Sequence, residues 1–304
     1  MKFLPFHKTI YDEMRAVEKH PMRRQIIQVP YDSGHKDCRM GQGPGHILRH
    51  LKAEKSFPAD ELEGDELDVL GRFELEVGTS FAVARQLAEK VCNVAGSGAF
   101  PLVLAGGCIS CVGTLAGLGA PPPVIIWLDA HGDFNTPETT ISGFLDGMAL
   151  ATAVGRCWGK LAATVPGFRP VPESQAFLVG AHEFDVNERV LLDSSAVCLI
   201  DPQGMRAQGL RAGLEPLWAK MQTHTRRAYL HIDLDVLDPA EGRANQFAAP
   251  GGLTLTELLG IVSLVRERFM LAAAAITAYD PQYDEGERTV RAAVAVIREL
   301  WKQV

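Results

Sequence analysis

Short, almost continuous apolar runs recur along the chain and constrain its fold more than any other feature. Each run has the length of a strand, is rich in apolar and β-branched residues, and is bounded by Gly, Pro or polar residues. Runs that are apolar at nearly every position are typical of parallel strands covered on both faces. The runs are RQIIQVP (24–30), PLVLAGG (101–107), PVIIWLDAH (123–131), QAFLVGA (175–181), AVCLIDP (196–202), RAYLHIDLDV (227–236) and LAAAAITAYDP (271–281).

Helical patterns lie between these runs and after the last of them. Apolar residues recur every three or four positions over 74–95, 253–269 and 286–300, and TLTE at 254–257 resembles a capping box. Alternation of strands and helices predicts a three-layer α/β sheet. We expect a single domain over residues 1–304, with residues 1–23 as an N-terminal extension, because no change in composition marks a linker.

Composition and charge narrow the class of partner. The 304 residues are 47% hydrophobic and carry a net charge of −7, which does not favour a nucleic acid or an anionic membrane as partner. The apolar runs are far shorter than the roughly 20 residues that span a bilayer. The N-terminus lacks the apolar region of a signal peptide, so we expect a cytoplasmic protein with reduced cysteines.

Acidic residues follow two of the predicted strands. Asp129, His131 and Asp133 come after VIIWL, and Asp233 and Asp235 come after AYLHI. In parallel sheets, ligands bind where the carboxyl ends of strands meet. Gathered carboxylates repel one another unless a cation relieves the charge, so the two motifs together predict a divalent metal site. Loop capping is the alternative for either motif taken alone.

His231, two residues before Asp233, has several possible roles. His231 shares a strand face with Asp233, so its side chain is expected to point toward the metal side. It is a hydrogen-bonded core residue, a partner of a metal ligand, or a ligand itself.

The motifs resemble those of the ureohydrolase family, which includes arginase, agmatinase and formiminoglutamase. The resemblance covers about residues 24–304, and the two aspartate motifs are its specific part. The matching segments are IIQVPYDSGHKDCRMGQGPGHILRHL (26–51), DAHGDFNTPETTISGFLDG (129–147), LVGAHEFDVNE (178–188), HIDLDVLDPA (231–240), APGGLTLTELL (249–259) and ITAYDPQYDEGERTVRAAVAVI (276–297).

This resemblance implies a fold, a metal centre and a reaction. The fold would be a three-layer α/β/α structure with an eight-stranded, mainly parallel sheet, and the chain would form trimers or hexamers. Two Mn²⁺ ions would supply hydroxide for hydrolysis of a guanidino or amidino C–N bond. The implied metal ligands are Asp129, His131, Asp133, Asp233 and Asp235, with Asp133 also holding the proton of the water, and the implied substrate-binding residues are Asn135, Ser142, Asp185 and Glu188.

The sequence departs from the family pattern at three positions. Cys108 stands where the family has a sixth, histidine ligand, although a different gap places Ile109 there. A thiolate ligand disfavours Mn²⁺ relative to Zn²⁺ or Fe²⁺, so one site is either modified or empty. Cysteine here, with HGDFNTPETT (131–140), is similar to relatives that hydrolyse Nω-hydroxy-L-arginine.

The other two departures affect catalysis and substrate choice. Phe144 and Asp146 stand where the family has its catalytic histidine, and Asp146 either relays protons in its place or is a turn residue. Ala278 stands where the family has a guanidinium-binding glutamate. Arginine is therefore a less favoured substrate unless Asp280 or Asp284 supplies the missing negative charge.

Two functions therefore follow from the sequence. The first is a metal-dependent amidinohydrolase acting on an arginine-like or hydroxyarginine-like small molecule. The second is a non-catalytic relative with a partly occupied metal site that acts as a binding or regulatory subunit. Histone-deacetylase-like amide hydrolysis on the same fold ranks last, since it needs a histidine pair that we do not find.

Overall fold

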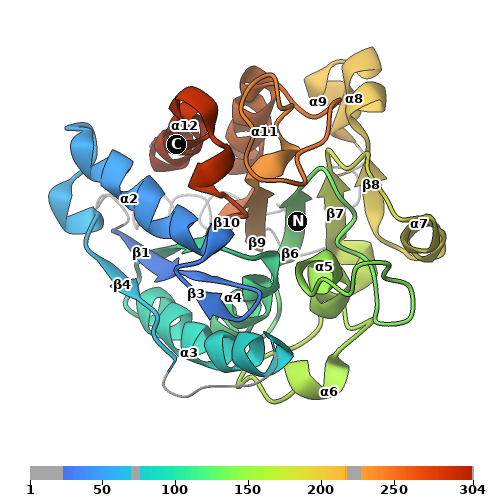
Figure 1. Cartoon of the computed structure of the whole chain (residues 1–304), viewed down its shortest axis with the longest axis horizontal. Coiled ribbons are helices and arrows are strands. Elements are labelled where there is room, and N and C mark those ends of the chain that lie inside the picture. Colours follow the sequence, from blue (N-terminus) through green and yellow to red (C-terminus); the bar gives the residue numbers. More distant parts are fainter. Residues whose placement is uncertain (1–22, 70–75, 216, 218–226, 303–304) are drawn as a thin grey trace, which may run out of the picture.

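A computed structural model describes residues 23–69, 76–215, 217 and 227–302. The predicted N-terminal extension, residues 1–23, lies outside the described residues except for Arg23. An eight-stranded parallel sheet forms the centre, in the order β4-β1-β5-β10-β9-β6-β7-β8 (Figure 1). Its strands are β1 (Arg24–Val29), β4 (Gly64–Glu66), β5 (Phe100–Ala105), β6 (Val124–Leu128), β7 (Ala176–Val179), β8 (Cys198–Ile200), β9 (Arg227–Asp233) and β10 (Met270–Thr277).

The sheet confirms the predicted fold class and all seven predicted strands. Of the eight strands in this sheet, only β4 was not predicted, because its sequence, GDE, is short and polar. An edge strand pairs on one side only and is not fully covered, so it needs no apolar run. A separate hairpin of β2 (Tyr31–Asp32) and β3 (His35–Lys36) follows β1.

Helices cover both faces of the sheet, and Figure 1 shows α11 and α12 on one side and α3 and α4 on the other. Alternate strand residues face the two layers, since Leu102 and Leu104 join one core and Val103 and Ala105 the other. The helices are α2 (Gly43–Ala53), α3 (Glu76–Gly96), α4 (Cys111–Leu118), α5 (Ala149–Ala153), α6 (Gly159–Ala162), α7 (Val186–Asp193), α8 (Pro202–Gln208), α9 (Leu210–Gly213), α11 (Leu255–Arg268) and α12 (Arg288–Trp301).

The predicted capping box is present at the start of α11. The hydroxyl of Thr254 accepts from the backbone N–H of Glu257 at 3.2 Å, and the Glu257 carboxylate accepts from the backbone N–H of Thr254 at 2.9 Å. Short 3₁₀ turns follow several strands and carry some of the polar motifs. They are η1 (Arg39–Gln42), η2 (Ala59–Glu61), η3 (Cys108–Ser110), η4 (Asp146–Met148), η5 (Glu173–Gln175), η6 (Leu234–Val236), η7 (Pro281–Tyr283) and η8 (Glu285–Glu287).

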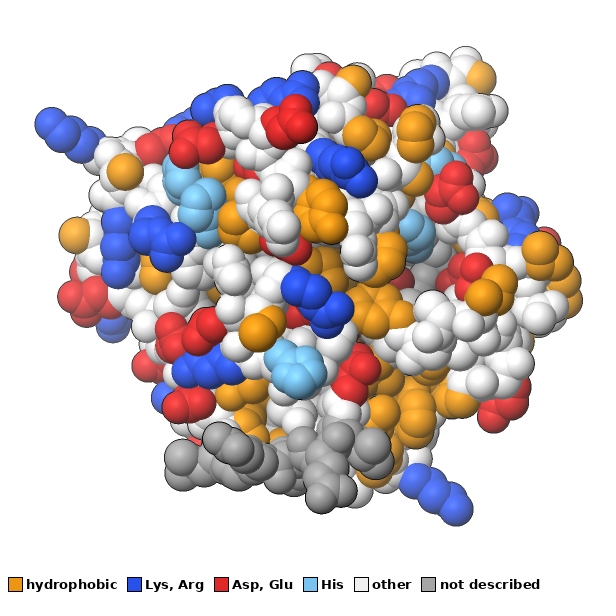
Figure 2. Space-filling view, in the orientation of Figure 1, with side chains coloured by type: hydrophobic (Ala, Val, Ile, Leu, Met, Phe, Trp, Pro, Cys, Tyr) orange, Lys and Arg blue, Asp and Glu red, His pale blue; other side chains and the backbone are white. Residues whose placement is uncertain are grey.

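The surface mixes charges of both signs. Figure 2 shows Lys and Arg side chains interspersed with Asp and Glu on the face drawn. Within the described ranges, no helix is both long and apolar enough to cross a membrane.

Candidate metal and substrate site

Motifs that are far apart in the sequence meet at one edge of the sheet. The neighbouring strands β5, β10, β9 and β6 are parallel, so their carboxyl ends lie together. Cys108 begins the turn η3 after β5, and the 129–133 motif follows β6 directly. Asp233 ends β9, and Asp235 lies in η6. Strand order therefore brings all six predicted metal ligands to the same edge.

The ligand atoms form two overlapping groups. Cys108, Asp129 and Asp233 offer atoms within 4.8 Å of one another, and so do Asp129, His131 and Asp235. Asp129 belongs to both groups. The Cys108 Sγ lies 3.0 Å from Asp233 Oδ2, and the His131 Nδ1 lies 3.4 Å from both Asp129 Oδ1 and Asp235 Oδ2.

Cys108 rather than Ile109 points into this cluster. Ile109 lines a separate small cavity, and its backbone N–H donates to Asp146. The geometry therefore agrees with the alignment that places cysteine in the position of the family's histidine.

Asp133 belongs to neither ligand group, but it lines the same cavity and has a free acceptor. Its Oδ2 is buried and has no hydrogen-bond partner in the described part of the chain. The residue also has a φ of 48°, in the left-handed region that non-glycine residues rarely adopt. A strained residue with an orphaned buried oxygen is typical of a site that holds a ligand.

Neighbouring groups orient the other carboxylates. Asp129 accepts hydrogen bonds from the Trp127 indole N–H at 3.0 Å and from the His131 backbone at 2.8 Å. Asp235 accepts from the Asn245 side-chain amide at 3.2 Å. Neither Trp127 nor Asn245 was singled out from the sequence, since nothing in the local pattern distinguishes Trp127 from a core residue or Asn245 from a loop residue.

Burial and mutual repulsion oppose the ionisation of three of the clustered carboxyl groups. Burial, followed by repulsion from Asp235, raises the pKa of Asp129. Burial, followed by neighbouring aspartates, raises the pKa values of Asp133 and Asp233 well above their ordinary range. A bound cation would relieve this cost by pairing with the ionised forms.

Asp235 differs from the other three aspartates in the direction of its pKa shift. Burial opposes its ionisation, but the adjacent His131 and the Asn245 amide lower its pKa to about 2. The same contact acts on the imidazole, because burial opposes its charging and Asp235 and Asp129 nevertheless raise the pKa of His131. Burial, followed by the charge of Asp233, raises the pKa of the Cys108 thiol, so without a cation the sulfur keeps its proton.

Five of the six predicted metal ligands, all except Asp129, line a cavity of about 420 Å³. This volume fits a small-molecule ligand. All four predicted substrate-binding residues and both predicted catalytic residues line it: Asn135, Ser142, Asp185, Glu188, Asp133 and Asp146. Phe144 and Phe247 stack at the cavity with ring centroids 5.4 Å apart, and Ile141 is 79% exposed beside them. The cavity thus has an acidic floor and an apolar rim.

The predicted substrate-binding residues differ in whether their polar atoms already have hydrogen-bond partners within the protein. The Asn135 side-chain amide donates to Asp185 at 3.1 Å, and the exposed Ser142 hydroxyl accepts from the Phe144 backbone at 3.1 Å. Glu188 is buried, and its two carboxylate oxygens accept backbone N–H groups of Phe134 at 2.8 Å and Asp185 at 3.2 Å. Glu188 therefore holds the surrounding loops together rather than offering a free carboxylate.

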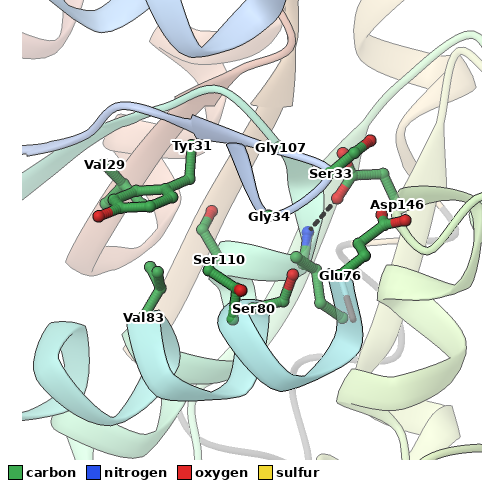
Figure 3. Close-up of a pocket in the computed structure, with 12 residues that line it drawn as sticks. Val29, Tyr31, Ser33, Gly34, Glu76, Ser80, Val83, Gly107, Ser110 and Asp146 are labelled. Carbon is green, nitrogen blue, oxygen red and sulfur yellow. Dashed lines mark hydrogen bonds between the residues drawn. The ribbon is translucent and has the colours of Figure 1, made fainter. Parts of the chain in front are cut away.

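Asp146 lies between the main cavity and a second, small one of about 20 Å³. Figure 3 shows it beside Glu76 and the β2–β3 hairpin, where its Oδ1 accepts the Ile109 N–H at 3.0 Å. The buried Ser110 hydroxyl also lines the small cavity and has no partner in the described part of the chain. Burial, only partly offset by that hydrogen bond, raises the pKa of Asp146 to about 7. Asp146 is thus able to gain and lose a proton near neutral pH.

Neither Asp280 nor Asp284 is among the residues that line the cavity around Ala278. Ala278 lines the cavity with a φ of 60°. Asp280 accepts the backbone N–H of Gln282 at 3.0 Å, and Asp284 accepts the Tyr279 hydroxyl and backbone N–H groups at the start of α12. Both carboxylates are engaged away from the cavity, so the suggested compensation by Asp280 or Asp284 is not seen.

His231 is buried and does not belong to either ligand group. Its ring stacks on Trp127 with centroids 3.6 Å apart and an interplanar angle of 9°. Both ring nitrogens have partners, because Nδ1 lies 2.8 Å from the Tyr229 hydroxyl and Nε2 lies 3.2 Å from the Thr277 hydroxyl. Burial lowers the pKa of His231 to about 3, so the imidazole is neutral. It is a hydrogen-bonded core residue next to the ligand cluster.

Comparison with known proteins identifies the family. The sequence profile of the arginase family matches residues 23–302. The chain belongs to the arginase family. It is 31% identical to an arginase of Bacillus caldovelox over 291 residues, covering 91% of this chain and 97% of that protein. The crystal structure of arginase from Bacillus cereus superposes with a TM-score of 0.80 at 27% identity, covering 92% of this chain and 98% of that one.

A further relative has a different substrate. The N(omega)-hydroxy-L-arginine amidinohydrolase of Streptomyces lavendulae is 32% identical over 182 residues, which cover 59% of each chain. The arginase-family chain described here therefore resembles enzymes named for arginine and for its N-hydroxylated form.

Proposed function

We propose that this protein is a metal-dependent amidinohydrolase that cleaves a C–N bond of a guanidino small molecule. One observation carries the proposal: five of the six predicted metal ligands line a ligand-sized cavity, Asp129 lies within reach of four of them, and a buried Asp133 oxygen has no partner in the described residues. Family membership supports the same reaction class. The complete set of carboxylates makes the non-catalytic alternative less favoured, since repelling charges have little use in an empty site.

Six residues would hold two divalent cations. Cys108, Asp129, Asp133 and Asp233 would form one site, and His131, Asp129, Asp233 and Asp235 the other. Oxygen and imidazole ligands fit Mn²⁺, while the Cys108 sulfur favours Zn²⁺ or Fe²⁺ in the first site or leaves only one site filled. Bound there, the cations would lower the pKa of water and so provide hydroxide at neutral pH.

The side chains would then manage the protons of the reaction. The free Asp133 oxygen would hold the proton of the attacking water. Asp146 has a pKa of about 7, so it would deliver a proton to the leaving nitrogen as the C–N bond breaks and the C–O bond forms. In this proposal Asp146 takes the place of the family's catalytic histidine.

The cavity walls favour a substrate with an amino-acid tail. Asn135, Ser142 and Asp185 would contact that tail, and Glu188 would keep Asp185 in place through its backbone hydrogen bonds. A fully charged guanidinium would lack a counter-ion at Ala278. N-hydroxylation makes a guanidine less basic, so Nω-hydroxy-L-arginine suits this pocket better than arginine does. The similarity to the Streptomyces lavendulae enzyme supports this choice.

Metal content and product release test the proposal. Protein purified with Mn²⁺ is analysed by plasma mass spectrometry as wild type, Cys108→His and Asp129→Ala, and each form is then incubated with hydroxyarginine or arginine. We expect about two ions per chain in the wild type, their loss in Asp129→Ala, and release of ornithine with hydroxyurea or urea. One ion that rises to two in Cys108→His would mean that cysteine leaves the first site empty. Absence of bound metal under all conditions would refute the hydrolase assignment.

We also propose that the chain acts as one domain in a cytoplasmic homo-oligomer, a trimer or hexamer, as the family resemblance implies. Sedimentation equilibrium would measure the mass of the assembly, and a monomer at working concentrations would contradict this part.

A further inference from the structure

Four buried side chains form a continuous hydrogen-bonded chain behind the cluster. The Tyr229 hydroxyl lies 2.8 Å from His231 Nδ1, His231 Nε2 lies 3.2 Å from Thr277 Oγ1, and Thr277 Oγ1 lies 3.1 Å from Cys108 Sγ. None of the four is more than 2% exposed. This hydrogen-bonded chain ends on the Cys108 sulfur, which stands in the position of the family's histidine ligand. It therefore bears directly on how a cysteine could serve as a ligand there.

Strand geometry explains how these residues meet. Tyr229 and His231 are two positions apart on β9, so their side chains point to the same face as Asp233. Thr277 ends β10 and is paired in register with Asp233, and β10 also pairs with β5, after which Cys108 follows. The imidazole is also fixed by stacking on Trp127, whose indole N–H binds Asp129.

The hydroxyl of Thr277 has two acceptors within reach. One is the Cys108 sulfur at 3.1 Å, and the other is the Ile232 carbonyl at 3.4 Å. While Cys108 is a thiol, its S–H can donate to Asp233 Oδ2 at 3.0 Å, and Thr277 is free to donate to the carbonyl.

A thiolate fixes the direction of every bond in the chain. A thiolate only accepts, so the Thr277 O–H must turn to it. The Thr277 oxygen then accepts from the Nε2–H of the neutral imidazole, and Nδ1 accepts from the Tyr229 O–H. All three donors thus point toward the sulfur, an arrangement in which each bond polarises the next.

We propose that Thr277, oriented by His231 and Tyr229, donates a hydrogen bond to the Cys108 thiolate and positions its sulfur as a ligand of the first metal site. This inference rests on the proposed metal centre. The proton released from Cys108 on metal binding passes to solvent, and the chain supplies the donor that a buried anionic sulfur needs. Thr277, His231 and Tyr229 are positioning residues that do not touch the metal.

Spectroscopy of cobalt-loaded protein tests the inference without an activity assay. Co²⁺ is titrated into chelator-treated protein, and thiolate-to-cobalt charge-transfer absorption reports on the sulfur. Thr277→Val removes the hydroxyl and keeps the branched shape, and Thr277→Ser restores the donor. We expect Thr277→Val to move the band to lower energy, because the unbonded sulfur holds its electrons less tightly. We also expect it to weaken first-site Co²⁺ affinity about 10- to 100-fold, as is usual for residues that orient ligands.

Two further variants keep the outcome interpretable. Tyr229→Phe removes only the far hydroxyl, and we expect a smaller shift in the same direction. Cys108→Ser must abolish the band. A Cys108-dependent band that is unchanged in Thr277→Val, with unchanged affinity, would overturn the hydrogen-bond inference alone. A wild-type protein that binds Co²⁺ without any thiolate band, or binds none, would overturn both this inference and the proposed first site.

Discussion

Replacing Asp146 by Asn should change how the stability of the metal-free protein depends on pH. Asp146 is 7% exposed and its pKa rises from an ordinary 3.8 to about 7, chiefly through burial. Between these two pH values the folded protein keeps a proton on Asp146 that the unfolded chain has released. The stability contributed by this carboxyl is therefore greatest at low pH and is lost as the pH rises through about 7.

The size of the effect follows from the two pKa values. At about 1.4 kcal/mol per pKa unit, the full difference between 3.8 and about 7 corresponds to about 4 kcal/mol. About 3 kcal/mol of this stability is lost as the pH rises from about 5 to about 8. Asparagine has no charge to bury and can still accept the Ile109 N–H, so Asp146→Asn should gain that stability relative to the wild type as the pH rises.

Urea unfolding of chelator-treated protein, followed by circular dichroism across this pH range, measures the difference directly. Asp60→Asn, which removes an aspartate from the exposed surface, is the matched control and should show little pH-dependent difference. A difference between Asp146→Asn and the wild type that stays within about 1 kcal/mol over the whole range would refute the reasoning, because burial of a charged Asp146 would then cost too little.

Three further predictions concern the same site. Gly107→Ala should lose about 1–3 kcal/mol of stability in thermal melts, because its Cβ would lie 2.7 Å from Asp146 Oδ1. Gly147→Ala, whose Cβ would meet nothing within 4 Å, is the control and should melt nearly as the wild type does. Mn²⁺ at about 100 times its dissociation constant should stabilise the wild type by about 2.7 kcal/mol, and Asp129→Ala should not respond. Ala278→Glu should raise kcat/KM for arginine at least about tenfold relative to hydroxyarginine, since a buried counter-ion contributes about 2–5 kcal/mol. Ala249→Glu, elsewhere on the cavity wall, should not reproduce that preference.

Much of the site could be predicted because its residues lie next to elements with strong local patterns. Asp129 and Asp233 directly follow or end apolar strands, so a parallel sheet places them at its carboxyl edge. The sequence left open whether Cys108 or Ile109 aligns with the family's histidine, and in the structure Cys108 lies beside Asp233 whereas Ile109 lines a separate small cavity. Geometry also limits Glu188 to a supporting role, because its oxygens are occupied by backbone groups.

Other features depend on residues that carry no local signal. Asn245 lies in a loop, yet it donates to Asp235 at 3.2 Å and to the Ala278 carbonyl at 2.8 Å. The raised pKa of Asp146 comes from burial beneath a hairpin and the N-terminal part of α3, segments far away in the sequence. Such neighbours are set by packing and cannot be identified from residue type or periodicity.

The sequence alone determined the class of fold, seven of the eight strands of the central sheet and the acidic motifs at strand ends, since each depends on residue patterns within a few positions. Only the tertiary structure decided the order of the strands. That order places β10 between β5 and β9, and so brings Thr277 against both Cys108 and His231. Strand pairing is a contact between distant segments, chosen by the packing of the whole sheet, and the hydrogen-bonded chain behind Cys108 exists because of it.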